Sequence, residues 1–152
     1  MDNTNPPTKP LVTGNAVLQM IPQKPPMAMI DTIIAVTAQK ARTALTITKE
    51  NIFCDEGFFQ APGLSENIAQ TAAAQVGYLS HLAGEAPPVG FIGAIKNLNI
   101  EQLPEVGDQL ITEIEIEHEI MNFTVINGIS KVGDQVMAKC QMKIFIADTE
   151  QA

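Results

Sequence analysis

Residues 58–83, FFQAPGLSENIAQTAAAQVGYLSHLA, organise the rest of this chain. Apolar residues recur at helical spacing and predict one apolar helix face, formed by Ile68, Ala72, Val76, Leu79 and Ala83. Small residues fill most of the opposite side, and no Lys or Arg occurs between Ala61 and Ile95. A helix that is apolar or small nearly all round is usually buried. Its amides and hydroxyls interrupt any apolar run long enough to span a bilayer.

Glu66 is the only carboxylate in this predicted helix. We expect Glu66 to lie in the first turn, where the positive end of a helix favours an anion. A single charge at the mouth of a buried helix makes Glu66 a candidate for chemistry. The alternative is a surface carboxylate that only stabilises the start of the helix.

Composition limits the classes of partner. The chain has 152 residues, enough for one domain with a sizeable core, and its net charge is −8, which argues against nucleic acid and anionic membranes. Two cysteines are too few for a disulfide framework and suit a reducing compartment. Residues 1–10 are polar and Pro-rich without a signal-peptide pattern, so we expect a flexible tail, a single domain over 11–152 and a cytoplasmic location.

Strand patterns occur on both sides of the helix. An antiparallel sheet curled around a single helix accounts for strands that both precede and follow the helix in the sequence. The expected fold class is therefore α+β. Between 109 and 120 four glutamates alternate with isoleucines and His118, which predicts a solvated glutamate face and places His118 on the helix side. Gly128 is expected to mark a bulge. The predicted strands cover residues 27–36, 40–48, 91–100, 109–120, 123–131 and 135–146.

Four short segments appear in a fixed order along the chain. They are MIPQKPPMAMID at 20–31, FFQ at 58–60, PG at 62–63 followed by ENIAQ at 66–70, and VGDQL at 106–110. This series resembles the 3-hydroxyacyl-[acyl-carrier-protein] dehydratases, which have the hotdog fold, an antiparallel sheet wrapped around one long buried helix. The short spacing from Pro-Gly to Glu is most similar to the dehydratase-like branch associated with aryl-polyene and flexirubin-type pigment synthesis.

The resemblance implies roles for particular residues. Glu66 matches the family's catalytic acid, whereas the family's G-H-F-P-G segment with its catalytic His is absent, and Gln23 stands where a second His is expected. The backbone amides of Gly63 and Leu64 are the implied groups that polarise the thioester carbonyl, with glycine needed for close approach. Further candidates for substrate contact, with packing as the alternative for the apolar ones, are Gln23, Asn67, Met27 and Phe91.

The missing His leaves three functions open. Loss of one general acid or base typically costs about 10²- to 10⁴-fold in rate, and His81 lies about 22 Å along the helix from Glu66. The chain is therefore expected to be a dehydratase that uses Glu66 alone or with a water or partner side chain, a hotdog thioesterase, or a non-catalytic subunit. The implied partners are an acyl thioester, acyl carrier protein and further hotdog subunits, in a homodimer, a larger hotdog oligomer or a pair with a second dehydratase. No metal or cofactor is expected beyond the phosphopantetheine or CoA of the substrate.

Overall fold

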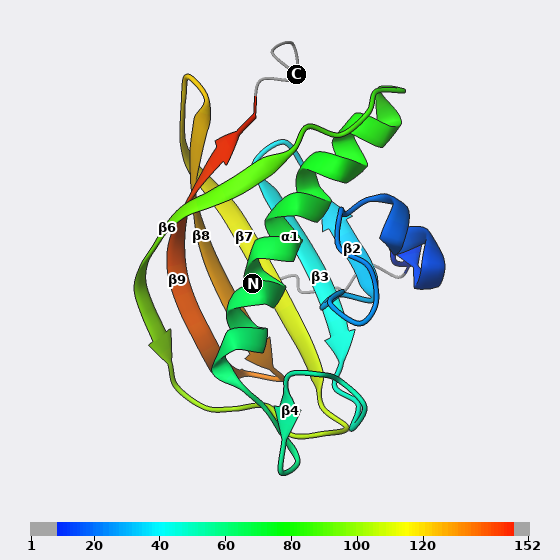
Figure 1. Ribbon diagram of the computed structural model, residues 1–152, viewed down its shortest axis with the longest axis vertical. Coiled ribbons are helices and arrows are strands. Elements are labelled where there is room, and N and C mark those ends of the chain that lie inside the picture. The colour runs from blue at the N-terminus through cyan, green and yellow to red at the C-terminus, as the bar shows by residue number, and fades with distance from the viewer. Residues whose placement is uncertain (1–8, 148–152) are drawn as a thin grey trace, which may run out of the picture.

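The computed structural model describes residues 9–147, in which one long helix lies across a curved antiparallel sheet (Figure 1). The sheet has seven strands in the order β1-β2-β3-β7-β8-β9-β6, and β4 and β5 form a separate hairpin. This confirms the α+β architecture predicted from the sequence. Residues 1–8 of the predicted tail lie outside the described residues. The elements are β1 Val12–Thr13, the 3₁₀ helix η1 Gly14–Gln19, β2 Thr32–Val36, β3 Lys40–Thr46, β4 Cys54–Asp55, β5 Phe58–Phe59, α1 Ala61–Leu82, β6 Gly90–Ile100, β7 Gln109–Ile120, β8 Phe123–Val132 and β9 Gln135–Ile146.

Helix α1 begins at Ala61 and packs Leu64, Ile68 and Ala72 into the main core beneath it. Its last turn projects past the sheet (Figure 1), where the side chain of Leu82 is 66% exposed. The prediction of a buried helix is therefore correct for most of α1 and wrong for its final turn. Within residues 9–147, no helix has the length and hydropathy required to cross a membrane.

Buried amide side chains of α1 hold the segment that precedes β2. Asn67 Nδ2 donates to the carbonyl of Met29 at 2.8 Å, and Gln70 Nε2 donates to the carbonyl of Met27 at 2.9 Å. Gln70 Oε1 also accepts from the Met29 amide. Because helix side chains satisfy this backbone, β2 begins at Thr32, and the predicted strand from Met27 is wrong over its first five residues.

A bulge in β7 changes which side chains face the helix. Ile116 pairs with Ile126, but the next pair along the ladder is His118 with Val125, so one residue is left over between them. A bulge of this kind reverses the alternation of side chains beyond it. His118 is consequently exposed rather than on the helix side as predicted, and Glu119 lines the cavity described below.

Gly128 does not mark a bulge, contrary to the prediction. It pairs in regular register with Ile114 and Cys140 in the middle of β8. A Cβ at this position would overlap the Ile68 side chain, so the glycine allows α1 to approach the sheet closely.

The N-terminal segment packs against the other side of α1. A second apolar cluster joins η1 and β2 to the helix around Val17, Ile33 and Ala74. Gly77 lies at the closest approach, where a Cβ would overlap the backbone carbonyl of Met20. The position of the following loop, residues 22–26, therefore depends on this glycine.

Candidate functional site

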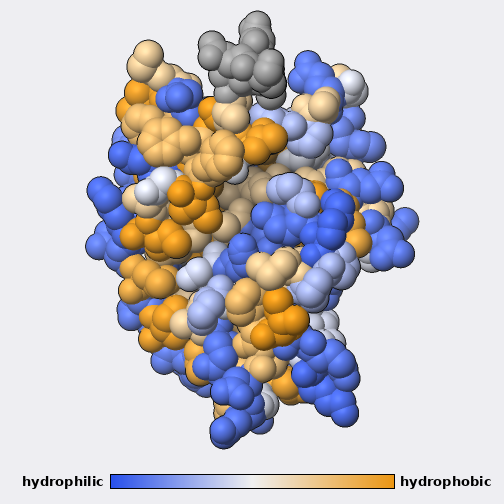
Figure 2. Space-filling model, in the orientation of Figure 1, coloured by the Kyte–Doolittle hydropathy of each residue, from blue (hydrophilic) through white to orange (hydrophobic). Residues whose placement is uncertain are grey.

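A cavity of about 550 Å³ lies between α1, the facing surface of the sheet and the segment that leads into β6. Its walls are largely apolar and include Ile114, Ile126 and Ile144 from three adjacent strands. Figure 2 shows this face of the molecule hollowed near its middle, with hydrophobic residues gathered on the side of β6. The cavity has the size and the lining typical of a small-molecule site.

Glu66 contributes a carboxylate to this cavity. It lies on the same stripe of α1 as Ala69, Ala73 and Val76, all of which line the cavity. The alanines leave room beside the carboxylate, and Glu66 is half-buried. Because α1 begins at Ala61, Glu66 is in the second turn, so the predicted position in the first turn is wrong. The helix dipole, whose effect fades beyond the first turn, therefore explains little about this residue.

Glu119 is a second carboxylate of the cavity, which the sequence analysis missed because the β7 bulge was not foreseen. It pairs with Thr124, which also lines the cavity. Gly128 packs beneath Ile68 of α1. Thr124 precedes Gly128 by four residues on β8, so their backbones are about 13 Å apart at 3.3 Å per residue. On the sheet, Glu119 therefore lies about four residues from the point where α1 packs through Ile68, the second residue after Glu66.

Two of the predicted substrate contacts line the cavity together with Glu66. They are Gln23, from the loop after η1, and Phe91, at the start of β6. Met27 is 40% exposed and is not among the lining residues, and its carbonyl is bound by Gln70.

Asn67 is fully buried, with both ends of its amide engaged by the fold. Besides its bond to Met29, its Oδ1 accepts a hydrogen bond from the Thr112 hydroxyl. A side chain whose hydrogen bonds are already made within the core is not available to substrate in this arrangement. The geometry thus favours a structural role for Asn67 over the substrate contact implied by the resemblance.

The amides of Gly63 and Leu64 are likewise paired within the chain. Both donate to the carbonyl of Gln60, at 2.9 and 3.2 Å, and both residues are buried. A Cβ at Gly63 would overlap the side chains of Phe53 and Phe59. Packing in this chain therefore accounts for the glycine, and the proposed approach of a ligand is not needed to explain it.

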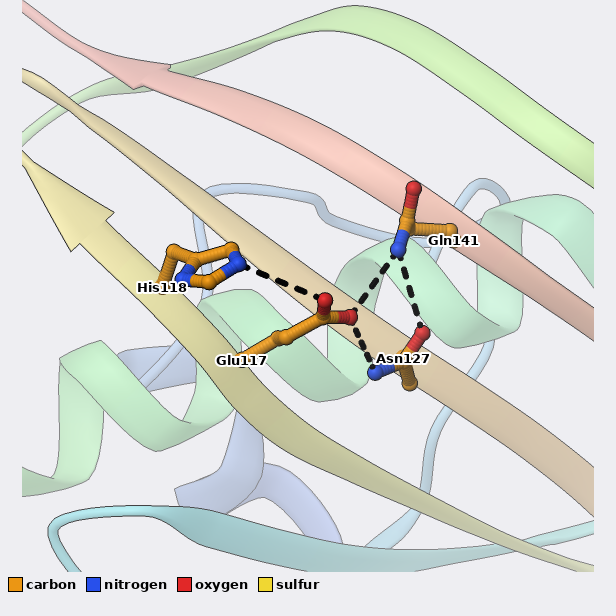
Figure 3. A network of polar contacts seen from close by, with 4 residues as sticks. All are labelled: Glu117, His118, Asn127 and Gln141. Carbon is orange, nitrogen blue, oxygen red and sulfur yellow. Dashed lines mark hydrogen bonds and ion pairs between the residues drawn. The ribbon is translucent and has the colours of Figure 1, made fainter.

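The outer face of the sheet carries a polar network instead of a cavity-facing histidine (Figure 3). Glu117 Oε1 accepts from Asn127 Nδ2 at 2.8 Å and from Gln141 Nε2 at 3.0 Å, while His118 Nε2 lies 3.4 Å from Glu117 Oε2. The hydrogen bond from Asn127 is the largest cause that lowers the pKa of Glu117, with smaller contributions from Gln141 and His118. This network joins β7, β8 and β9 on the solvated side of the sheet, away from Glu66.

Removal of the Asn127 amide should raise the pKa of Glu117. We expect Asn127→Ala to shift the carboxyl titration of Glu117 toward its ordinary value, because the charged form loses its main hydrogen bond. The lowered pKa favours folding at neutral pH, and this contribution is lost as pH falls through the folded-state pKa, below about 4.3. Carboxyl NMR titration measures the shift, and an unchanged pKa in the variant would contradict the assigned cause.

The two thiols are poor candidates for nucleophiles. Burial raises the pKa of Cys140 to about 11, and burial also raises the pKa of Cys54. Both thiols are therefore protonated at neutral pH, and neither lines the cavity. The ionisable side chains that line the cavity are the carboxylates of Glu66 and Glu119.

An antiparallel sheet wrapped around one long, largely buried helix is the architecture of the hotdog fold. The family model described as "ApeP-like: ApeP dehydratase" matches residues 15–152. The chain belongs to this ApeP-like dehydratase family.

Known proteins agree with this assignment. A 3-hydroxyacyl-[acyl-carrier-protein] dehydratase FabZ from a Thermoanaerobacter species is 25% identical over 145 residues, which are 89% of this chain and 97% of that protein. The FabZ of Paramagnetospirillum magneticum is 28% identical over 142 residues, covering 87% and 85%. The solved dehydratase heterocomplex ApeI:P from Xenorhabdus doucetiae matches with a TM-score of 0.81 at 15% identity, covering 88% of this chain and 92% of that chain. This structural match supports the hotdog fold.

Proposed function

We propose that this protein is a dehydratase of 3-hydroxyacyl thioesters and that Glu66 is its catalytic acid. The observation that carries the proposal is the half-buried Glu66 carboxylate facing an apolar cavity of about 550 Å³. An acyl chain would fill the apolar part, and its thioester end would lie near Glu66. Membership of the ApeP-like dehydratase family and similarity to FabZ proteins support this reaction class.

Dehydration requires one proton to leave carbon 2 and one to join the departing oxygen. The C2–H electron pair becomes the C2=C3 double bond, the C3–O bond breaks, and the hydroxyl leaves as water. In our proposal the Glu66 carboxyl donates the proton to the leaving hydroxyl. Glu119 belongs to a part of the sheet whose backbone is about 13 Å from the point beneath Ile68, so we propose that a partner subunit supplies the base for carbon 2. The reaction as written needs no metal or cofactor beyond the carrier of the acyl group.

The free edge of β6 is the proposed contact for that partner. Among the described residues this strand pairs only with β9, and its large apolar side chains are exposed, for example Phe91 at 59% and Leu98 at 44%. Residues 86–100 contain no carboxylate, although the chain as a whole carries a net charge of −8. Two such edges can therefore meet without strong repulsion, and an unpaired apolar edge strand is a template for a second strand. We propose a homodimer formed through β6.

Ile95→Asp should convert this dimer to a monomer. Ile95 is 41% exposed on β6, and a carboxylate there would be buried and repelled by its copy in the pair. The control is Ile52→Asp, at a 49% exposed residue in the loop before β4. Light scattering coupled to size exclusion should report twice the chain mass for the wild type and the control. A dimer that survives Ile95→Asp, or a monomeric wild type, would refute the proposed contact.

Turnover of a 3-hydroxyacyl-carrier substrate tests the function directly. The protein is assayed alone and mixed with a catalytic dehydratase, with enoyl thioester and free thiol measured together. Enoyl product from the protein alone supports the proposal. Thiol release without enoyl product would identify a thioesterase, and carrier binding without either product would identify a non-catalytic subunit.

The carrier and the cellular location are further parts of the proposal. FabZ proteins are named for acyl-carrier-protein substrates, and we propose acyl carrier protein as the carrier here. The free thiols of Cys54 and Cys140 are compatible with a reducing compartment, which supports a cytoplasmic location.

A further inference from the structure

The floor of the cavity, which is the sheet surface that faces α1, has a polar corner. Rows of paired side chains from β7 and β8 follow one another along this floor, and the first two are apolar. The rows are Ile114–Gly128, Ile116–Ile126 and Glu119–Thr124. Both members of the third row line the cavity, and this row continues across β9 and β6 through the apolar residues Ile144 and Ile92, which also line it. A carboxylate and a hydroxyl thus interrupt an otherwise apolar floor.

This polar corner lies at the end of the cavity that is remote from Glu66. The amide of Phe59, just before α1, donates to the carbonyl of Pro104, just after β6. The start of β6 instead follows the end of α1 through a short connection, residues 83–89. Strand β6 therefore runs antiparallel to α1, and Ile92, near the start of β6, marks the row closest to the end of the helix.

The length of the cavity suits an extended acyl chain. The residues of α1 that line it run from Glu66 to Val76, a rise of about 15 Å at 1.5 Å per residue. On the floor, Thr124 lies about 13 Å from Gly128. An extended chain covers about 3.6 Å with every three bonds, so about 12 chain atoms span this distance. A chain with its thioester near Glu66 can therefore place its far end at the polar corner.

The polar corner can bind a hydrogen-bond donor. Neither Glu119 nor Thr124 makes a side-chain hydrogen bond or ion pair within residues 9–147. A carboxylate only accepts hydrogen bonds, whereas a hydroxyl both donates and accepts. None of the described residues that line the cavity is Lys, Arg or His, so no cation there would neutralise an anionic chain end. Glu119 is exposed, and a polar chain end can therefore keep contact with water at this end of the cavity.

We infer that Glu119, with Thr124 beside it, is the specificity-determining residue for the end of the acyl chain that is remote from the thioester. The corner favours a chain end that donates a hydrogen bond, such as a hydroxyl group, and rejects a chain end that carries a carboxylate. This inference rests on the proposed function and adds to it the chemical class of the chain end. Glu119 selects the chain and takes no part in proton transfer.

The test uses acyl pantetheine analogues with an amide in place of the thioester and a methyl, hydroxyl or carboxylate group at the far end. Chains of about 12 atoms reach the corner and chains of about 6 atoms do not. Calorimetry measures the affinity of each analogue for the full chain. Because Glu119 is exposed and makes no hydrogen bond, Glu119→Gln should fold as the wild type does.

Glu119→Gln should change the affinities of the two long polar analogues in opposite directions. The long carboxylate-ended analogue should bind about 5- to 100-fold more tightly, because the variant removes a like charge close to the chain end. The long hydroxyl-ended analogue should bind about 3- to 10-fold more weakly, since an amide oxygen is a weaker acceptor than a carboxylate. The methyl-ended analogues and all short analogues should be unaffected. Glu115→Gln removes the same charge from the outer face of the sheet, and it is the matched control that should change none of these affinities.

The other outcomes separate the inference from the proposed function. Unchanged binding of both long polar analogues in Glu119→Gln overturns the inference. Equal tightening of the short and long carboxylate-ended analogues, or the same change in Glu115→Gln, also overturns it, because the effect would then come from overall charge. In these cases binding of the methyl-ended analogues leaves the proposed function standing. If no analogue binds the wild type, the proposed function fails and the inference fails with it.

Discussion

Glu66→Gln is expected to lower the rate of 3-hydroxyacyl thioester dehydration by at least about 100-fold and by up to about 10⁴-fold. Glutamine preserves the size of the side chain but cannot donate a proton to the leaving hydroxyl. The Glu66 side chain makes no hydrogen bond or ion pair within residues 9–147, so the free energy of unfolding should change by less than about 0.5 kcal/mol. Ultraviolet absorbance of the conjugated enoyl thioester measures the rate, and urea titration measures the stability.

Two other glutamates provide controls of equal charge. Glu115→Gln changes an exposed residue of β7, so its rate should match the wild type. Glu119→Gln removes the second carboxylate of the cavity, which lies at the end of β7 and has no proposed role in proton transfer, and should reduce the rate by less than about 10-fold. Equal losses in Glu66→Gln and Glu119→Gln would mean that the charge of the cavity matters rather than an acid at Glu66. Unchanged turnover in Glu66→Gln would remove Glu66 from the mechanism.

Gly77→Ala is expected to destabilise the protein by about 3 kcal/mol. On helix propensity alone the change should stabilise α1 by about 1 kcal/mol. The new Cβ, however, would overlap the backbone carbonyl of Met20, which cannot move away without displacing the N-terminal segment. Urea unfolding at a fixed protein concentration gives the free energy of unfolding, and the concentration is kept constant because dimerisation would shift the transition.

Gly93→Ala is the matched control for this prediction. Its new Cβ would also meet an atom at close range, but that atom belongs to the Phe145 side chain, which is 37% exposed and can rotate. We expect a cost below about 1 kcal/mol there, since a flexible side chain yields more easily than a backbone carbonyl. A Gly77→Ala variant as stable as the wild type would contradict the close packing of α1 against the segment that carries Gln23.

The overall fold could be predicted from the sequence because two patterns with different periods both pointed to it. The spacing of Ile68 and Ala72 predicts a helix, and the alternation in 109–120 predicts a strand; both elements are present. The predicted start of β2 was wrong because the side chains of Gln70 and Asn67 form the hydrogen bonds of the backbone at Met29. A tertiary contact of this kind leaves no local pattern in the sequence.

The candidate site was predictable only in part. Glu66, Gln23 and Phe91 do line one cavity, but their roles remain predictions. Asn67 and Gly63 were assigned to substrate by resemblance, whereas their contacts within the chain explain their identities by packing and hydrogen bonding. A motif reports which residue types recur at a position, and it does not report whether their hydrogen-bonding groups are already engaged inside the protein.

The irregularity in β7 limits how far positions can be compared by counting along this strand. Two residues of β7 that both precede the bulge point to the same side of the sheet when an even number of positions separates them. When the bulge after Ile116 lies between them, an odd number of positions is required instead. In a relative that lacked this single extra residue, the second residue after the counterpart of Ile116 would face the interior, whereas in this chain the third residue, Glu119, does so. A sequence alignment that runs through this strand without a gap would then pair residues on opposite faces of the sheet, although the neighbouring residue types agree.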